Sequence, residues 1–304
     1  MSSRIRIPGL VDVIRLDEPA AIRAIVADPR LDRDFKKEGP LVNRLLAGRI
    51  RKVLRVGSHP LPAVAPREAE DRARLQALLE QRLQNAQLGT PEQRATLAAY
   101  VRGEKGEGVL GPTAQAAIGE LFAPGYAARK DRWKAARTLD AAPRSFNPLQ
   151  LLWWGLTGAV ARARKTLAAP VDGDPAAVHA TGVAVHNLVR GLKIMRGLWR
   201  QPFARESLTD EAVICQCAVA PPNVLRQWKA SASTLWGEVE PGAITLLQLD
   251  AARYRSPSHQ IVFMTDSWSR CPAHHWTASL LGAVWREAKA GAPPAKKTSV
   301  KGGR

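Results

Sequence analysis

The stretch that decides the fold is FMTDSWSRCPAHHW, residues 263–276, which places one cysteine, Cys271, directly before a proline. Apolar residues then recur at helical spacing, which predicts a helix from Cys271-Pro272 to about residue 288. The sulfur of Cys271 would lie at the N-terminus of that helix, where unpaired amides and the macrodipole favour an anion. Arg270 adds positive charge beside it. Because the thiolate is the metal-ligating form, Cys271 is a candidate metal ligand.

Upstream of this stretch, a helix, a turn and a strand are predicted in that order. The helix covers roughly residues 208–219 and ends at Pro221-Pro222. A β-like stretch then begins at Trp236-Gly237, with a turn at Pro241-Gly242 and the strand AITLLQL at residues 243–249.

The strongest helix pattern lies at 174–199, where Asp174 is a typical N-cap and Pro175 occupies the first helical position. On one stripe of this helix the spacing places His179, Gly182, Val183 and His186.

Towards the N-terminus, residues 10–16 read as a strand, and a helix follows from Asp17 to before Pro29. A helical stripe is predicted at 66–86, and the pattern is again helical from about 113 to 170. The Gly-rich stretch 102–112 is expected to be a loop. The fold class is therefore mainly α with a small β region.

The order of these features resembles the C-terminal third of the cytochrome P-450 superfamily. In that family a proline pair ends one helix, a G-x-x-x-P-x-G turn and an apolar strand follow, and a phenylalanine opens the loop to the axial cysteine. The residues here that resemble those features are Pro221-Pro222, the 237–242 turn, the 243–249 strand, Phe263 and Cys271. The 11–35 segment and the 174–202 helix also resemble family elements.

The resemblance implies a truncated P-450-like helical haem-thiolate fold, with residues 1–288 as a single haem-binding domain and 289–304 as a disordered basic tail. It implies haem b as cofactor, with Cys271 as its axial thiolate. Arg226 resembles the family arginine that pairs with a haem propionate, Trp268 could cover the proximal side of the sulfur, and Arg270 stands next to the family's basic propionate position, which is Ser269 here.

The sequence also departs from the family pattern. With the proline pair aligned, Cys215 and Ala218 stand where the family's ExxR glutamate and arginine would be. The loop from Phe263 to Cys271 is one residue longer than usual and lacks its glycines.

The family's long helix over the haem carries an A-G-x-x-T motif, whose threonine relays protons. The corresponding stretch here is ATGVAVH, residues 180–186, so Val185 or His186 stands in place of that threonine. A small residue between His179 and His186 would let a flat ring approach. A distal imidazole could then act as general base on a peroxide. Thr181, Gly182 and His186 are therefore the candidate catalytic residues, and His179 is a candidate haem contact.

Three function classes follow. The leading one is a haem-thiolate oxidoreductase acting on an apolar organic substrate, by monooxygenation or by peroxide-driven oxidation or rearrangement. The second is an inactive relative that serves as a haem-binding sensor or subunit. The third is a basic zinc protein with a Cys₃His site, whose candidate ligands are Cys215, Cys217, Cys271 and His274.

Composition and charge bear on the partners of the protein and on its cellular compartment. The formal net charge of the 304 residues is +18, which suits an acidic ferredoxin-like electron donor. Outside the tail, Lys and Arg are not clustered with aromatics, which makes nucleic acid an unlikely partner. Three cysteines, an odd number, favour a reducing cytoplasm over a disulfide framework. The start of the chain is too polar for a signal peptide, and no apolar run is long enough for a membrane span.

Overall fold

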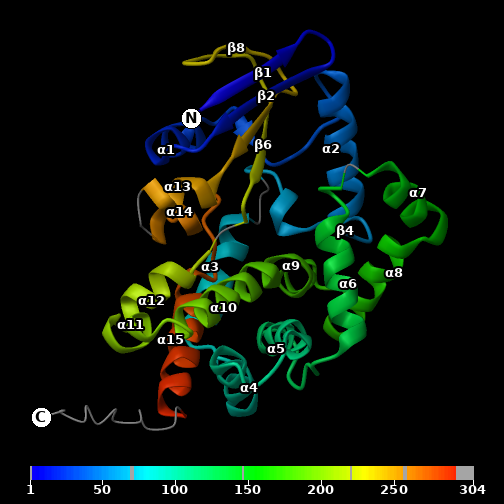
Figure 1. Ribbon diagram of the computed structural model, residues 1–304. Helices are drawn as coiled ribbons and strands as arrows, with labels where there is room; N and C mark the ends of the chain where they lie inside the picture. The colour runs from blue at the N-terminus through cyan, green and yellow to red at the C-terminus, as the bar shows by residue number, and fades with distance from the viewer. Residues whose placement is uncertain (1, 69–71, 146, 220, 256–258, 292–304) are drawn as a thin grey trace, which may run out of the picture.

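The computed structural model describes residues 2–68, 72–145, 147–219, 221–255 and 259–291 (Figure 1). A mixed sheet and the first helices lie at one end, at the top of the view, and the remaining helices form the larger body below it. Residues 292–304, most of the expected disordered tail, fall outside the described residues.

The main sheet combines three strands from the N-terminal segment with two strands from the last third of the chain. Its strand order is β1-β2-β9-β6-β3, in which β2 pairs parallel with β9 and all other pairs are antiparallel. The strand bounds are β1 Ser3–Ile7, β2 Val11–Leu16, β3 Leu31–Asp32, β6 Val224–Trp228 and β9 Ile244–Leu247. Ile14 and Leu16 of β2 are fully buried, as alternation along a half-buried strand requires. The strands predicted at 10–16 and 243–249 are confirmed.

The first third of the chain supplies small helices around this sheet. The bounds are α1 Pro19–Ala27, α2 Leu41–Val53, β4 Arg55–Val56, β5 His59–Pro60, the short 3₁₀ turn η1 Pro62–Val64, and α3 Arg72–Gln84. The predicted helices beginning after Asp17 and within 66–86 are confirmed.

The helical body is built from α4 to α15. Their bounds, with the short strands and turns between them, are α4 Pro91–Arg102, α5 Glu107–Gly119, α6 Lys130–Ala141, α7 Pro148–Thr157, α8 Ala159–Ala168, η2 Ala169–Val171, α9 Pro175–His179, η3 Ala180–Ala184, α10 Val185–Trp199, α11 Pro202–Ser207, α12 Asp210–Cys217, β7 Ala232–Thr234, β8 Gly237–Val239, α13 Leu249–Arg255, α14 His259–Phe263 and α15 His274–Ala290.

Helix α5 overturns one expectation, because the Gly-rich stretch 102–112 is not all loop. The segment from Glu107 is helical and almost wholly buried. A Cβ on Gly111 would lie 2.1 Å from the indole of Trp133, so this glycine lets α6 pack against α5. Tertiary packing therefore outweighs the low helix propensity of glycine.

Helices α9 and α12 begin at side-chain caps, the first of them the predicted Asp174, whereas the last helix begins later than predicted. The side chain of Asp174 accepts a hydrogen bond from the Ala176 amide at 2.8 Å, and Thr209 Oγ1 accepts one from the Ala212 amide at 3.2 Å. Helix α15, however, begins at His274 rather than at Cys271. The residue before it has φ −90° and ψ 12°, which ends the preceding turn rather than extending the helix.

Gly191 on α10 allows this helix to approach the backbone at the end of α12 closely. A Cβ at this position would lie 2.3 Å from the carbonyl oxygen of Cys217, at the end of α12. We therefore expect Gly191→Ala to lower the free energy of unfolding by about 1–3 kcal/mol, because the two backbones must separate. Gly197→Ala on the same helix, where a Cβ meets nothing within 4 Å, should instead raise it by about 0.5–1 kcal/mol. Urea denaturation of both variants checks this, and equal effects would contradict the packing argument.

Candidate functional site

The loop from Phe263 to Cys271 is closed by its own backbone. The Cys271 amide donates to the Phe263 carbonyl oxygen at 2.9 Å, and the Ser267 amide donates to Met264 O at 2.9 Å. Met264 has φ +51°, a left-handed conformation that normally favours glycine. This is where the sequence lacks a glycine of the family loop, so the turn is kept at a cost in backbone strain.

The thiol of Cys271 is half-buried at the end of this loop. Burial raises its pKa above the ordinary value for a cysteine, Glu80 raises it further, and a hydrogen bond from the Ala273 amide opposes the change. The expectation that Arg270 and a helix N-terminus keep Cys271 as a thiolate is therefore wrong for the free thiol in this structure. The helix begins three residues later, and Arg270 is paired with Glu80 at 2.7 Å.

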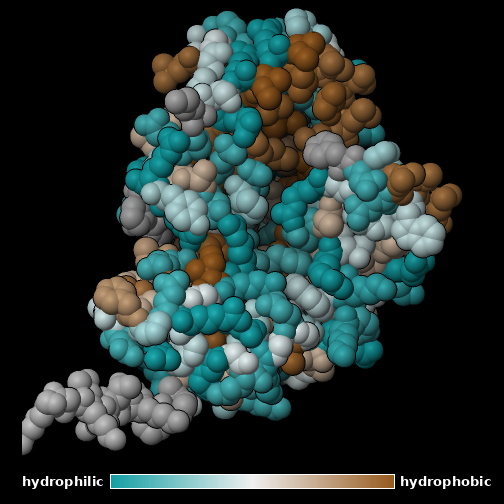
Figure 2. Space-filling view, in the orientation of Figure 1, coloured by the Kyte–Doolittle hydropathy of each residue, from teal (hydrophilic) through white to brown (hydrophobic). Residues whose placement is uncertain are grey.

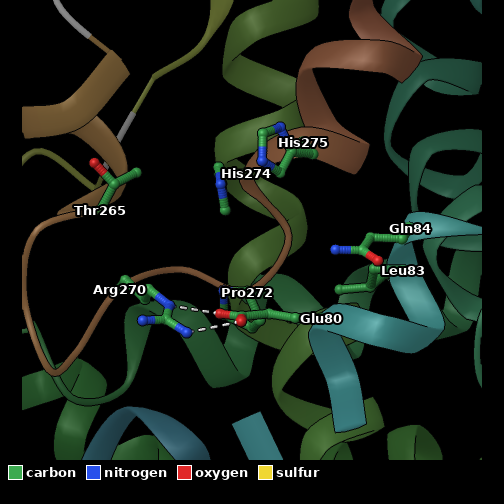
Figure 3. Close-up of a pocket in the computed structure, with 8 residues that line it drawn as sticks. All are labelled: Glu80, Leu83, Gln84, Thr265, Arg270, Pro272, His274 and His275. Carbon is green, nitrogen blue, oxygen red and sulfur yellow. Dashed lines mark hydrogen bonds and ion pairs between the residues drawn. The ribbon is translucent and has the colours of Figure 1, made fainter. Parts of the chain in front are cut away.

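A cavity of about 320 Å³ lies beside this loop, between α3 and the start of α15. In Figure 3 the ion pair between Arg270 and Glu80 forms one wall, and His274 and His275 lie across the opening from it. His274 Nδ1 is 2.9 Å from the carbonyl oxygen of Cys271, which links this ring to the loop. The cavity therefore flanks the cysteine and is lined by polar groups of both charges.

Trp268 lies among three arginines that come from separate parts of the chain. The guanidinium carbons of Arg33, Arg67 and Arg226 are 5.3, 5.5 and 5.8 Å from its ring centre. Arg226, on β6, is buried and donates to Ser269 Oγ at 3.0 Å. Cations over an indole face are favourable singly, but three of them also repel one another.

The nearby carboxylates are already engaged. Asp28 binds the guanidinium of Arg30 at 2.7 Å, and the fully buried Asp32 is paired with the ammonium group of Lys229. The pKa of Asp32 is lowered by its hydrogen bond from Lys229 and by backbone amides, although its burial opposes this. Asp28 and Asp32 are thus paired with Arg30 and Lys229, while three guanidinium groups surround Trp268.

His179, at the end of α9, lies close enough to Arg33 for their charges to interact. Burial, helped by Arg33, lowers the pKa of His179 to about 4, so the ring is neutral at neutral pH. Its Nδ1 is buried and has no hydrogen-bond partner among the described residues. An orphaned buried nitrogen of this kind is costly, and His186 Nε2 lacks a partner among the described residues in the same way.

His186 points elsewhere, although the sequence places it on the same stripe as His179. Its ring stacks on Trp133 of α6 with centroids 4.8 Å apart. The reason is the five-residue π-helical segment Ala180–Ala184 between them, which adds a residue to the turn and rotates everything that follows. The prediction of a single stripe through both histidines is therefore wrong.

Thr181 and Gly182 also face helices rather than the cysteine loop. Thr181 is fully buried, its hydroxyl donates to Ala177 O at 2.7 Å, and its carbonyl oxygen accepts from the side chain of Gln115 at 2.9 Å. Beside Gly182, a Cβ would come within 3.0 Å of the side chains of Leu139 and Leu167. The gap at Gly182 is thus filled by two leucines.

The structure consequently divides the sequence candidates into two groups. Cys271, Phe263, Trp268 and Arg226 lie together around one loop, and Arg33 connects this group to His179. Thr181, Gly182 and His186 lie against α5, α6 and α8, and the charge of Arg270 is taken up by Glu80. Sequence reasoning missed Arg33 and Arg67. In the structure Arg33 directly follows β3, the edge strand of the main sheet.

Comparisons with solved structures now bear on the fold. No family model and no curated protein matches the chain. A variant of cytochrome P450 OleT in complex with arachidonic acid has a TM-score of 0.56 at 11% identity, covering 94% of this chain and 82% of that one. Cytochrome P450EX alpha with myristic acid has a TM-score of 0.51 at 15% identity, covering 94% and 82%. Myxobacterial cytochrome P450 CYP267B1 in complex with myristic acid has a TM-score of 0.51 at 17% identity, covering 94% and 84%.

The chain has the cytochrome P450 fold. The prediction of a mainly helical, shortened P450-like fold is confirmed. Within it, the loop ending in Cys271 and the π-interrupted helix 175–199 are the elements that the sequence resemblance had singled out.

The zinc alternative finds no support in this P450 fold. Among the residues that the structure describes, no three or more His, Cys, Asp or Glu side chains are grouped closely enough to hold a metal ion. Cys215, Cys217, Cys271 and His274 all belong to the described residues, so they do not form a Cys₃His site. Over the same residues, no helix is both long enough and apolar enough to span a membrane.

The depressed pKa of His179 predicts a pH dependence of stability. Its folded-state pKa is about 4 against an ordinary value of 6.5, so the unfolded chain binds the proton more readily. Stability is therefore present above pH 6.5 and is lost as the pH falls towards 4, by up to about 3 kcal/mol. His179→Gln should remove this part of the slope between pH 6.5 and 4, measured by urea denaturation. The exposed His275→Gln should keep it, and an unchanged slope in the first variant would contradict the assignment.

Proposed function

We propose that this protein is a haem-thiolate oxidoreductase that acts on an apolar organic molecule, with Cys271 as the axial ligand of haem b. The observation that supports this most directly is that Cys271 ends a loop of a P450 fold whose Trp268 lies against three arginines. We assign the acid–base role to His179 rather than to His186, because His179 interacts with Arg33, one of these three arginines, while His186 stacks on Trp133.

The residues present fit haem in their donor chemistry. Haem b carries two carboxylate groups, and guanidinium forks suit carboxylates. Arg33, Arg67 and Arg226 bring three guanidinium groups to this loop, which such carboxylates could bind. The Cys271 thiol is only half-buried and already accepts one backbone hydrogen bond. A bound cation lowers the pKa of a thiol, so Cys271 would hold the haem iron as the thiolate even though burial raises the pKa of the free thiol.

When bound through a thiolate, haem supplies oxygen or peroxide activation, since the sulfur pushes electron density that favours O–O cleavage. The chain's own residues do the rest. Trp268 shields the sulfur from water, while Arg226 holds Ser269 and one face of the indole in place. A neutral His179 can accept a proton from a peroxide and return it, because its buried Nδ1 has no hydrogen-bond partner within the described parts of the chain. This favours peroxide as oxidant over a reductase-fed reaction with an acidic ferredoxin-like donor.

The substrate class is apolar, and a long-chain fatty acid is the first probe to use. Two of the solved P450 structures with the same fold contain myristic acid and one contains arachidonic acid.

Purified protein loaded with haem tests the proposal. We expect one haem per chain, and a ferrous–carbonyl band at the red-shifted position typical of a thiolate ligand. Hydrogen peroxide and myristic acid should then yield oxidised products detectable by mass spectrometry. Failure to retain haem would exclude the proposal, and a histidine-type spectrum would exclude Cys271 as the ligand.

A haem-binding sensor or subunit without turnover is the second candidate. The observation in its favour is that Thr181, Gly182 and His186 all face helices rather than the loop of Cys271. A thiolate spectrum without peroxide-driven product would favour this candidate.

A further inference from the structure

Helix α7 exposes most of its apolar side chains, although Trp154 packs against the core and the helix contacts α8. Within PLQLLWWGLT, none of the residues is buried. Its exposed apolar side chains are Leu149, Leu152, Trp153 and Leu156, each between 60% and 77% accessible. A helix that is apolar on most sides and lies on the surface is unstable in water unless something covers it.

A second apolar area lies on the same side of the molecule. Figure 2 shows hydrophobic surface over α7 and over α2 with the β1–β2 hairpin. In that second area the exposed residues are Ile7, Leu10, Leu41, Val42 and Leu45. The backbones of the hairpin and α2 are joined there, because the Val42 amide donates to Leu10 O at 2.9 Å.

A cationic hollow of about 490 Å³ lies where the end of α2, β4 and α8 meet. Its charged lining residues are Lys52, Arg55, Arg164 and Lys165, with no acidic residue among those lining it. Arg164 donates to the backbone oxygen of Lys52 at 3.1 Å, and Arg55 donates to that of Gly57 at 2.7 Å. Within the described residues, none of these four cations has a carboxylate partner. The hollow therefore attracts an anion of phosphate size.

The hollow and α7 are joined by α8, which follows α7 directly after Gly158 and carries Arg164 and Lys165. A surface with exposed leucines and tryptophan beside unpaired cations matches the boundary of an anionic bilayer, where apolar side chains enter the acyl region and Lys or Arg meet phosphates. A net charge of +18 opposes pairing of two copies of the chain through this face.

We propose that α7 and the hollow formed by α2, β4 and α8 dock on the surface of an anionic phospholipid bilayer. The exposed side chains of α7 enter the interface without spanning it, and the hollow binds a headgroup phosphate. This inference does not depend on haem binding, so it can fail while the proposed function stands, and the reverse.

Sedimentation of the full-length protein with phosphatidylcholine vesicles, with and without phosphatidylglycerol, tests the apolar part. We expect binding only when phosphatidylglycerol is present, and Leu152→Ser/Trp153→Ser to weaken it at least about tenfold. Phe203→Ser is the matched control, since Phe203 is 74% exposed on α11, and it should leave binding unchanged. Binding that survives the α7 substitution would overturn the proposal.

A charge-reversal pair tests the hollow. Lys52→Glu/Lys165→Glu should weaken binding to the anionic vesicles by about 30-fold or more, since each cation near such a surface contributes independently. Arg23→Glu/Lys105→Glu has the same net charge but alters exposed sites on α1 and after α4, so it should cost at most about threefold. Equal losses in both pairs would overturn the site. If the protein does not bind vesicles but forms a dimer, and the α7 substitution makes it monomeric, then a second copy of the chain covers this surface instead.

Discussion

Cys271→Ala is expected to abolish stable haem retention, weakening it at least about 100-fold, and to remove the thiolate-type ferrous–carbonyl band. The substitution deletes the coordinating sulfur, whereas loss of a residue that merely supports a ligand already costs about 10–100-fold in metal affinity. The fold should remain intact, because Cys271 is half-buried and its loop is closed by the backbone bond from its amide to Phe263. Haem content by the pyridine haemochromogen assay and the carbonyl spectrum measure the two effects.

The matched control for this experiment is Cys215→Ala. Cys215 is also half-buried, but it lies on α12. Its neighbour Cys217 is buried, which raises the pKa of that thiol to about 12 and keeps it protonated. Neither sulfur on α12 is therefore expected to contribute to the spectrum. A thiolate-type band that persists in Cys271→Ala would refute the assignment of the axial ligand.

Local patterns in the sequence predicted the elements that carry the site. Alternation gave the strand that ends at Leu16, and the Asp174-Pro175 start gave the long helix, because both signals depend only on near neighbours. The same reasoning failed for α5, where Gly111 is a packing position against Trp133 rather than a break. Glycine next to a bulky partner cannot be distinguished from glycine in a loop without the partner's position.

Side-chain direction was harder to predict than secondary structure. A single added residue in the π-helical segment separates His179 from His186, and helical spacing alone gives no sign of it. The charge on Cys271 likewise depends on Glu80, which is distant in sequence and pairs with Arg270. Arg33 and Arg67 reach Trp268 only because the chain folds back over it.

The missing ExxR pair shows how three-dimensional contacts replace a lost motif. With Cys215 and Ala218 at its two positions, α12 cannot form the family ion pair. Instead Arg253 of α13, which is buried, donates to the carbonyl oxygens of Gln216 at 2.8 Å and Ala218 at 3.4 Å. A cation at this position donates hydrogen bonds to the carbonyl groups at the end of α12 and complements the helix dipole.

Arg253 belongs to a wider connection that involves α10. Asp250 of α13 lies 3.5 Å from the guanidinium of Arg253 and 2.5 Å from that of Arg190 on α10. These contacts join α10, α12 and α13. An ion pair within α12 would not connect these three helices. We infer that Arg253 positions the segment leading to the cysteine loop.

Arg253→Met is therefore expected to lower the free energy of unfolding by about 3 kcal/mol, measured by urea denaturation. Methionine fills a similar volume, but two carbonyl groups at the end of α12 lose a charged donor, and buried hydrogen bonds to charge are costly to break. Arg255→Met on the same helix is the control. Its side chain is 48% exposed in an ion pair with Asp17, so its loss should cost less than about 1 kcal/mol. If the two variants lose equal stability, then Arg253 does not replace the missing pair, and α12 is held by its apolar contacts with α10 and α15 alone.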